Sequence, residues 1–347
     1  MSGLNPQQRE AIRYLDGPLL VLAGAGSGKT RVITQKIAYL IQECGMNPAN
    51  IAAITFTNKA AREMQERVGQ LLQGGSTAGL TICTFHSLGV RILREEAKAL
   101  GYKPKFSIFD STDCYSIFAD LSASVDKATI RSIQWLVSGW KNAMKSPDQA
   151  AAEAKSEIEV LAAKAYRDYA ATLKAYQAVD FDDLILLPMQ LFQEHPKIRD
   201  KWQNRLRYLL VDEYQDTNAC QYQLLKLLTG PRAMFTAVGD DDQAIYGWRG
   251  ADIDNLRKLP AEFPNLKVIK LEQNYRSTVR ILKAANNVIA NNEKLFDKKL
   301  WSEHGHGEQI SVTTYRDNDA EAEGVVMKLQ AHRFEQRTQF KIGRAHV

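Results

Sequence analysis

The chain has 347 residues, enough for about two domains, each with an apolar core of its own. Hydrophobic residues make up 45% and charged residues 24% of the sequence, which excludes a disordered or collagen-like protein. A net charge of +5, from 45 Lys and Arg against 40 Asp and Glu, leaves an anionic partner open without requiring one.

Six short apolar runs are followed by stretches with helical spacing, and this order is typical of a parallel α/β sheet. Each run leads into polar residues at its C-terminal end, where the ligands of such sheets bind. The predicted strands are residues 19–22, 51–56, 80–84, 208–211, 235–238 and 268–271.

The long segment between the third and fourth predicted strands, about residues 86–200, is predicted to be mostly helical because it has few glycines and an alanine-rich middle. Since the strand pattern resumes after it, we expect a helical subdomain inserted into the α/β domain. A further helix is predicted from Thr278, and residues 309–314 are predicted to be a strand of another unit. Asp180 precedes an apolar helical run, so its expected role is to cap that helix.

A glycine-rich loop follows the first predicted strand and precedes a helical pattern, which is the order that a P-loop requires. Backbone N–H groups of such a loop surround phosphates, Lys29 supplies a charge for the β and γ phosphates, and Thr30 can hold Mg²⁺. The strict pattern has Gly where this chain has Ala23, and the alternative interpretation is a glycine-rich turn before a helix. The residues predicted to bind a nucleotide are Ala23, Gly24, Ala25, Gly26, Ser27, Gly28, Lys29, Thr30 and Arg31.

Two acids end the fourth predicted strand. Asp212 suits Mg²⁺, and Glu213 is placed to orient and deprotonate the water that attacks a γ-phosphate. Without other signals, two acids after a strand more often belong to a turn or cap a helix. The presence of Gly28, Lys29 and Thr30 in the same chain favours the interpretation as a nucleotide site. Gln243, after the fifth strand, could reach the γ-phosphate, with a solvated acidic loop as the alternative. The residues that follow resemble a stacking platform: Tyr246, Trp248 and Arg249.

The four cysteines are widely separated and have no histidine at metal-ligand spacing, so they are predicted to be reduced thiols. The N-terminus has no secretory-signal profile, and no apolar run approaches the ~20 residues of a membrane helix. These features predict a cytoplasmic protein with no membrane partner.

Seven motifs stand in one order along the chain, at residues 4–8, 23–30, 55–61, 84–87, 211–218, 239–250 and 273–277. Their order resembles superfamily 1A DNA helicases of the UvrD, Rep and PcrA type, with the Rep type the nearest. The resemblance implies a RecA-like P-loop NTPase sheet, an inserted all-helical subdomain and the beginning of a second RecA-like domain. The expected division is residues 1–85 and 201–277 for the first motor domain, 86–200 for the insertion, and 278–347 for a truncated second motor domain.

The resemblance also implies roles for single residues. Gln8 would read adenine, Tyr275 would stack on it, and Arg276 would contact the γ-phosphate. Without the resemblance, Phe56 would be assigned to the core and His86 to a structural role. The single-strand track that the resemblance implies consists of Phe56, Thr57, Asn58, Thr84, His86, Tyr246, Trp248 and Arg249.

The activity that the resemblance implies is that of an ATP-dependent 3′–5′ DNA helicase and single-stranded DNA translocase. It would use ATP and Mg²⁺ and act on single-stranded and 3′-tailed duplex DNA. Residues 343–347 do not match the family's continuation, so truncation or foreign sequence is expected there. Without an arginine finger from a second motor domain, hydrolysis would fall by about 10³-fold or more, and processive unwinding is not expected. A non-motor ATP-binding switch and the motor part of a helicase–nuclease are the alternatives, and the Tyr246 and Trp248 loop argues against the switch.

Overall fold

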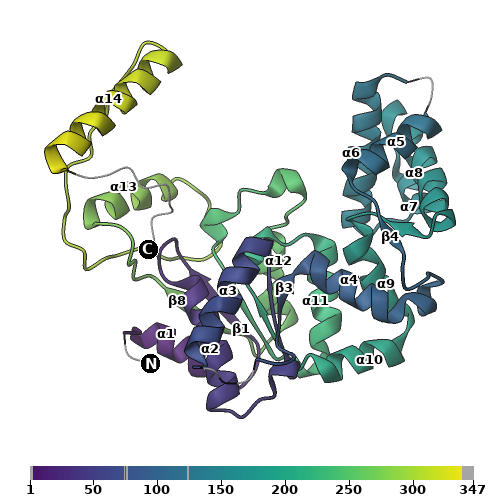
Figure 1. Cartoon of the computed structure of the whole chain (residues 1–347), viewed down its shortest axis with the longest axis horizontal. Helices are drawn as coiled ribbons and strands as arrows, with labels where there is room; N and C mark the ends of the chain where they lie inside the picture. Colours follow the sequence, from purple (N-terminus) through teal and green to yellow (C-terminus); the bar gives the residue numbers. More distant parts are fainter. Residues whose placement is uncertain (1–2, 74, 76, 123–124, 338–347) are drawn as a thin grey trace. The chain divides into compact units, whose positions relative to one another are not determined.

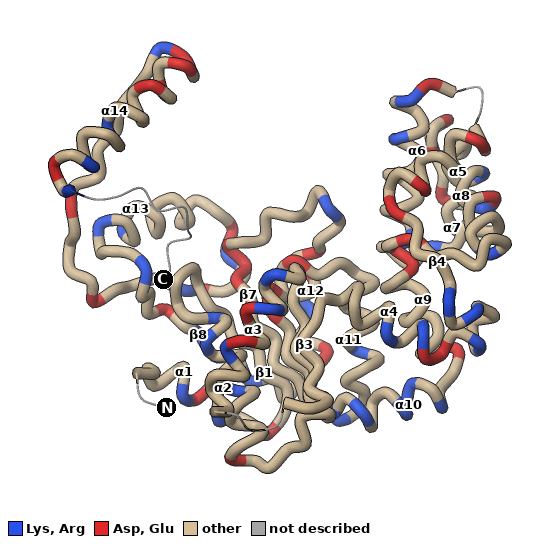
Figure 2. The backbone as a smooth tube through the Cα atoms, in the orientation of Figure 1, with Lys and Arg blue, Asp and Glu red and all other residues tan. Residues whose placement is uncertain are grey.

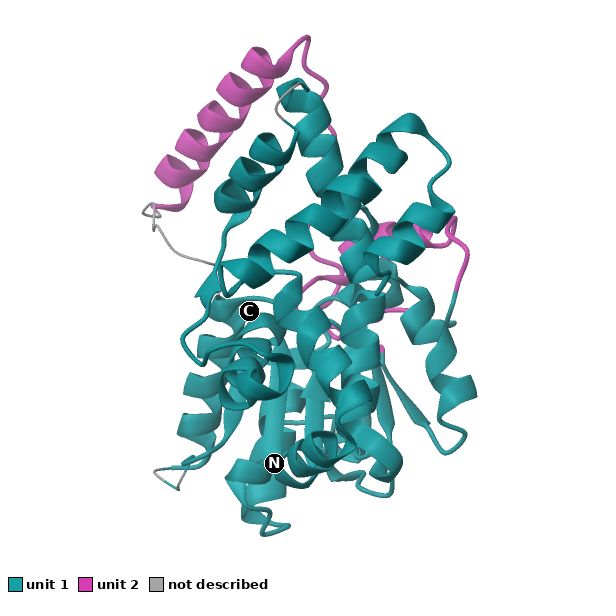
Figure 3. Cartoon of the chain, turned by 90° about the vertical axis from the view of Figure 1, so that its right-hand side faces the viewer, with its two compact units in different colours: residues 1–271, 295–297 teal, residues 272–294, 298–347 magenta. Residues whose placement is uncertain are grey.

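The computed structural model describes residues 3–73, 75, 77–122 and 125–337. The chain divides into two compact units, coloured separately in Figure 3. The first unit consists of residues 1–271 and 295–297, and the second of residues 272–294 and 298–347. Among the described residues, no helix combines the length and the apolar character needed to cross a bilayer.

Six parallel strands form the sheet of the first unit, in the order β3-β2-β6-β7-β1-β8 (Figure 1). Each begins and ends within one residue of its predicted bounds, so the predicted α/β fold with a parallel sheet is confirmed. The strands are β1 (Leu19–Ala23), β2 (Ile51–Thr55), β3 (Thr81–Thr84), β6 (Tyr208–Val211), β7 (Phe235–Gly239) and β8 (Lys267–Leu271).

Both faces of the sheet are buried along β1, β2, β6 and β7, because successive side chains of a strand point to opposite faces and both kinds are mostly apolar in these strands. In β1, Leu19 and Val21 belong to one core, and Leu20 and Leu22 belong to the other. The first core is closed by α1 (Pro6–Arg13), α2 (Lys29–Gln42) and α3 (Asn58–Leu71). The second core is closed by α4 (Phe85–Glu96), α9 (Asp183–Glu194), α10 (Pro196–Arg205), α11 (Ala219–Thr229) and α12 (Asp254–Glu262).

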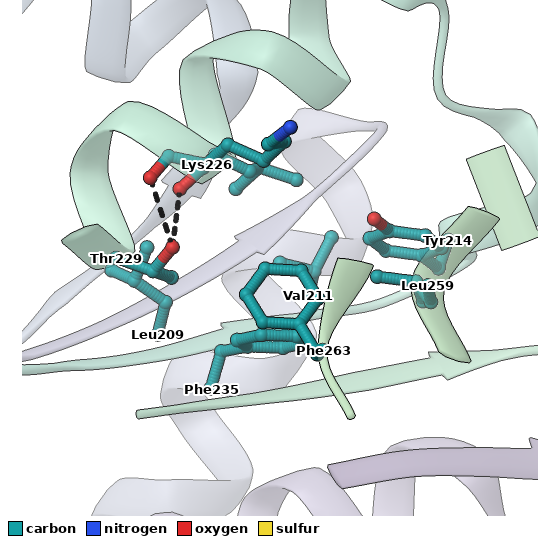
Figure 4. A pocket seen from close by; sticks show the side chains of 9 residues that line it. Leu209, Val211, Tyr214, Lys226, Thr229, Phe235, Leu259 and Phe263 are labelled. Atoms are coloured by element: carbon teal, nitrogen blue, oxygen red, sulfur yellow. Dashed lines mark hydrogen bonds between the residues drawn. The ribbon is translucent and has the colours of Figure 1, made fainter. Parts of the chain in front are cut away.

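A small apolar pocket lies between the sheet and the helices α11 and α12 (Figure 4). Phe235 and Phe263 meet there edge to face, with ring centroids 5.0 Å apart. The Thr229 hydroxyl is turned back onto its own helix and donates to the carbonyls of Leu225 and Lys226 at 3.0 and 3.1 Å. The cavity of about 10 Å³ has room for about one water molecule, so it is packing space and not a ligand site.

Between β3 and β6 the chain leaves the sheet, forms α4, continues through a helical body and returns through α9 and α10. The body has a core of its own, in which the rings of Phe118 and Tyr169 stack with centroids 4.2 Å apart. The insertion is helical apart from β4 (Ser107–Ile108) and β5 (Ala178–Val179), which pair where the chain enters and leaves the body. The helices of the body are α5 (Ser111–Leu121), α6 (Lys127–Asn142), α7 (Pro147–Glu153) and α8 (Glu157–Ala175).

The close approach of α4 and α9 depends on Gly89. A Cβ atom at this position would lie 1.7 Å from the Leu184 carbonyl oxygen, which is backbone and cannot turn aside. We therefore expect Gly89→Ala to lower the free energy of unfolding by about 2 kcal/mol or more, measured by denaturant titration. The control is Gly69→Ala in α3, where a Cβ atom meets nothing within 4 Å. That variant should be stabilised by a few tenths to about 1 kcal/mol, and equal destabilisation of both variants would contradict the packing argument.

The second unit contains α13 (Val279–Ile289) and α14 (Asn318–Gln336). Thr278 is the N-cap of α13, which confirms the predicted helix start. The predicted strand at residues 309–314 is wrong, since this segment is exposed and pairs with no strand in the described part of the chain. A strand is stabilised by hydrogen bonds to a second strand, and an alternating pattern alone does not supply them. Residues 343–347 lie outside the described residues.

Candidate functional site

The loop between β1 and α2, residues 24–28, lies at the carboxyl end of the sheet. Gly26 and Gly28 have φ angles of +70° and +91°, which side-chain-bearing residues rarely adopt. Ser27 is fully buried, and its hydroxyl donates to the Gly24 carbonyl at 2.7 Å. Within the described residues no side chain caps α2, and its first turn has no acid. The positive end of α2 is therefore available to an anion.

Gln8 connects α1 to this loop. It is fully buried, its side-chain oxygen accepts from the Asn5 N–H at 3.1 Å, and its amide nitrogen donates to the Ser27 carbonyl at 2.9 Å. A Cβ atom on Gly28 would lie 2.9 Å from the same amide nitrogen. The glycine thus permits both the turn of the loop and the approach of Gln8.

Lys29 and Glu213 form an ion pair, with 2.9 Å between Lys29 Nζ and Glu213 Oε2. Lys29 begins α2 after β1, and Glu213 follows β6, so the contact crosses the end of β7, which lies between these strands. Glu213 has a φ of +48°, a strained conformation for a residue with a side chain, which is typical of functional sites. The loop lysine and the strand-end acid Glu213 therefore meet at the carboxyl end of the sheet.

Asp212 is buried beside this pair, and its Oδ1 accepts from the Glu213 N–H at 3.0 Å. Burial, and then the charge of Glu213, raise the pKa of Asp212 to about 7, although Lys29 opposes the shift. Burial also raises the pKa of Asp216 to about 6, and Asp216 Oδ1 has no hydrogen-bond partner among the described residues. Three carboxyl groups, one buried and two half-buried, therefore lie at this end of the sheet near a single lysine, Lys29.

Gln215, in the 3₁₀ turn η3 (Tyr214–Asp216), joins the ends of β6 and β7. Its amide nitrogen donates to Glu213 Oε2 at 3.0 Å, and its side-chain oxygen accepts from the Asp240 N–H at 3.0 Å. The Gln243 amide in turn donates to the Asp240 carboxylate, so the predicted phosphate sensor is linked to the acids. In the sequence, the position of Gln215 two residues after Glu213 is the only signal of this role.

The loop after Gln243 presents an exposed aromatic and basic cluster. Tyr246 is 37% and Trp248 68% exposed. The Arg249 guanidinium carbon lies 5.1 Å from the Tyr246 ring centroid and 4.5 Å from that of Trp248. Exposed rings with a guanidinium beside them are typical of surfaces that stack on bases.

Phe56 and His86, two further candidates for the single-strand track, both contact other aromatic rings. Phe56 is half-buried and meets Phe85 edge to face, with centroids 5.7 Å apart. His86 meets the exposed Phe181 in the same way at 6.0 Å, and burial lowers the pKa of His86 below its usual value. Each of these two rings therefore packs against a neighbouring aromatic ring.

Thr57 and Thr84 act as helix caps. The Thr57 hydroxyl accepts from the Ala60 N–H at 3.1 Å, and the buried Thr84 hydroxyl accepts from the Ser87 N–H at 3.2 Å. Asn58, the first residue of α3, is exposed. The two threonines therefore position the starts of α3 and α4 at the carboxyl ends of β2 and β3.

Tyr275 and Arg276 belong to the second compact unit. The Tyr275 hydroxyl donates to Gln273 Oε1 at 2.9 Å, and its carbonyl lies 2.9 Å from His304 Nε2. Arg276 has an exposed side chain, and its N–H donates to Asn274 Oδ1 at 2.8 Å. These bonds define the local conformation of the motif within its own unit.

Two family models match the chain and together cover most of it. The family model of the UvrD/REP helicase N-terminal domain matches residues 4–264, and that of the UvrD-like helicase C-terminal domain matches residues 269–345. The chain belongs to the UvrD/REP helicase family. The resemblance drawn from seven motifs is thereby confirmed.

Curated UvrD/REP relatives align with nearly the whole chain. ATP-dependent DNA helicase Rep of Escherichia coli (strain K12) is 55% identical over 341 residues, covering 97% of this chain and 51% of Rep. Rep of Salmonella typhimurium is 54% identical over 341 residues, with the same coverage. ATP-dependent DNA helicase PcrA of Leuconostoc citreum is 44% identical over 333 residues, covering 95% of this chain and 44% of PcrA. The chain spans about half the length of these relatives.

Proposed function

We propose that this UvrD/REP chain carries the ATP-binding site and the strand-binding loop of a 3′–5′ DNA helicase that translocates on single-stranded DNA. The relatives are ATP-dependent DNA helicases by name, and the 2.9 Å contact between Lys29 and Glu213 is the observation on which the proposal rests. It unites the phosphate-binding lysine and the acid that hydrolysis needs. The substrates are single-stranded and 3′-tailed duplex DNA.

The nucleotide is ATP, with its phosphates in the loop of residues 24–28 and on Lys29. Gln8 reads the adenine edge with the amide hydrogen that Ser27 does not use. The buried acids fit a divalent cation, because the raised pKa of Asp212 and the unpartnered Asp216 Oδ1 reflect a lack of positive charge. Thr30 and Asp212 would hold Mg²⁺, which would neutralise phosphate charge when bound.

Glu213 is the general base in this proposal: its carboxylate takes a proton from the attacking water, while Lys29 moves from the ion pair onto the phosphates. Gln243 signals the γ-phosphate to the neighbouring loop through Asp240. The assignments of Tyr275 to base stacking and of Arg276 to the γ-phosphate rest on the motif alone.

The proposed strand track follows the carboxyl ends of β2, β3 and β7, where its candidates stand. Rings stack on any base, and hydroxyl and amide groups hold phosphates without reading sequence, which suits a motor that must pass every sequence. The track consists of Phe56, Thr57, Asn58, Thr84, His86, Tyr246, Trp248 and Arg249.

Two further parts of the proposal are the cytoplasmic location and the division of the chain into domains. The proposed domain boundaries follow residues 85, 200 and 277. Because the chain spans about half the length of its relatives, we expect slow hydrolysis and no processive unwinding from these residues alone. In the family resemblance a second motor domain supplies another arginine to the transition state, and such an arginine accelerates hydrolysis by about 10³-fold or more.

The strand-binding part of the proposal is tested with Trp248→Ala. We expect a labelled oligothymidine to bind about 5- to 100-fold more weakly, as measured by fluorescence anisotropy, because one base loses its stacking partner. ATP affinity should not change, since Trp248 is exposed and is not one of the residues proposed to bind the nucleotide. A wild-type chain that fails to bind the oligonucleotide, or a variant that binds it equally well, would contradict the proposed track.

A further inference from the structure

A groove of about 510 Å³ separates α6 of the helical insertion from the loop that carries Trp248. Trp135, on α6, lines one side of it, and Trp248 and Arg249 line the other. Both tryptophans are 68% exposed. The groove therefore has a large aromatic side chain on each wall, and the two come from positions 113 residues apart in the chain.

Trp135 has no role in the core of the insertion. The face of α6 that packs into that core consists of Ile130, Ile133, Val137 and Lys141, with helical spacing. Trp135 lies two residues from Ile133, about 200° around the helix, and so points away from that face. An exposed tryptophan beside a second one forms an apolar surface that generally marks a binding site.

Hydrogen bonds hold the α6 wall of the groove against the sheet domain. Asn142, which lines the groove, donates to Asp182 Oδ1 at 2.9 Å and accepts from the Asn218 amide of the sheet domain at 2.6 Å. Lys141 beside it donates to Asp180 at 2.7 Å and to Asp183 at 2.8 Å, which anchors α6 to α9. A ligand would therefore bind without first having to order the α6 wall.

The chemistry of the groove favours nucleobases. Two exposed indole rings offer flat faces, and the Arg249 guanidinium lies 4.5 Å from the Trp248 ring centroid. The other polar side chains of the lining are the Ser138 hydroxyl, the Asn142 amide and one carboxylate, that of Asp252. In Figure 2, Lys and Arg are interspersed with Asp and Glu along the insertion, so a strand held there would depend on stacking more than on a basic surface. A protein partner would be expected to meet a wider and more continuous apolar patch.

We propose that this groove holds bases of a single-stranded nucleic acid, with Trp135 as a stacking platform on the insertion opposite Trp248. This proposal rests on the proposed strand-binding function and extends it from the motor domain onto α6. Trp135 thereby becomes a binding residue, and the insertion contributes to holding the strand.

The test measures binding of a fluorescein-labelled oligothymidine by anisotropy to the whole chain and to three variants. Trp135→Ala should weaken binding about 5- to 100-fold, whereas Trp135→Phe, which keeps a stacking face, should recover most of the loss. The matched control is Tyr176→Ala, which removes an exposed aromatic ring of the insertion that does not line the groove. It should bind like the wild type. Thermal unfolding of all variants checks that the fold is kept.

Salt dependence separates stacking from charge. Trp135→Ala should raise Kd by the same factor at every salt concentration, while Arg249→Ala should also reduce the salt slope, because only the arginine displaces counterions. Photocrosslinking with an iodouracil-substituted oligonucleotide should label the tryptic peptide of residues 132–141, and Trp135→Ala should abolish that label.

The outcomes distinguish this proposal from the one on which it rests. If Trp248→Ala weakens binding and Trp135→Ala does not, the strand track stands and the role of Trp135 is overturned. If neither variant has an effect, both proposals fail. If Trp135→Ala abolishes a concentration-dependent dimer in sedimentation but leaves oligonucleotide binding unchanged, the groove is an interface between copies of the chain, and the nucleic-acid proposal is overturned.

Discussion

Glu213→Gln is expected to slow ATP hydrolysis by about 10²- to 10⁴-fold, the usual contribution of a positioned general base. Nucleotide affinity should stay the same or increase. In the resting structure Lys29 is held by the Glu213 carboxylate at 2.9 Å, and the neutral amide weakens this competitor of the phosphates. The Gln215 amide can still hold the new side chain, since it now donates to Glu213 Oε2 at 3.0 Å. Single-turnover hydrolysis with enzyme in excess would resolve even slow rates.

Two control variants define what the Glu213 result means. Lys29→Ala should lose nucleotide affinity, measured by calorimetry, because the charge for the phosphates is gone. Glu10→Gln, which removes an exposed acid paired with Lys267 at 3.1 Å, should change neither affinity nor rate. If Glu213→Gln hydrolyses ATP at the wild-type rate, Glu213 is not the base. If its affinity falls as far as that of Lys29→Ala, Glu213 acts in binding instead.

Lys141→Met is expected to lower the free energy of unfolding by about 3–5 kcal/mol, because it removes the cation from a buried cluster and leaves two carboxylates. Lys141 is 3% exposed and donates to both Asp180 and Asp183. The Tyr169 hydroxyl also donates to Asp180 Oδ2, at 2.8 Å. Burial opposes the charge of Lys141, but the two carboxylates outweigh it, and the pKa of Lys141 is raised. The measurement is denaturant unfolding.

The control for this variant is Lys145→Met, which breaks the more exposed ion pair with Glu153 and should cost less than about 1 kcal/mol. Equal losses in the two variants would contradict the argument from burial. A triple variant should regain stability relative to Lys141→Met alone, because neither of the two carboxylates that Lys141 contacts then stays buried without its cation. The three substitutions are Lys141→Met, Asp180→Asn and Asp183→Asn.

The loss in Lys141→Met should also depend on pH. Burial already raises the pKa of Asp183 to about 7 while Lys141 opposes the shift, so removal of Lys141 raises this pKa further. Between pH 4 and the raised pKa, the native state then binds more protons than the unfolded state, and stability falls as pH rises. The deficit of the variant relative to the wild type should therefore be larger at pH 8 than at pH 5. A deficit that is constant across this range would show that the carboxylates are not its cause.

Asp180 takes part in a larger interaction than the helix cap expected from the sequence. The N-cap residue of α9 is Asp182, and Asp180 Oδ1 accepts from the N–H of Asp183, the first residue of the helix, at 2.8 Å. The ion pair with Lys141 at 2.7 Å joins residues 39 positions apart, and no pattern in the sequence connects them. Lys36 is similar: helical spacing does not distinguish it from a surface lysine, yet it is fully buried. It donates to the Ala11 and Tyr14 carbonyls at the end of α1, at 2.8 and 2.7 Å.

The sequence alone determined the strands, the order of the motifs and the loop that ends in Lys29, because apolar runs and glycine-rich turns are local patterns with a direct conformational cause. The prediction of a strand at residues 309–314 is wrong because a strand also needs a second strand to pair with, and the residues of the segment itself do not encode that second strand. Only the tertiary structure decided which distant side chains meet: Lys29 with Glu213, Gln215 with the end of β7, and Trp135 opposite Trp248. Such contacts depend on the order of strands in the sheet and on how the insertion packs against it, and both are properties of the whole folded unit.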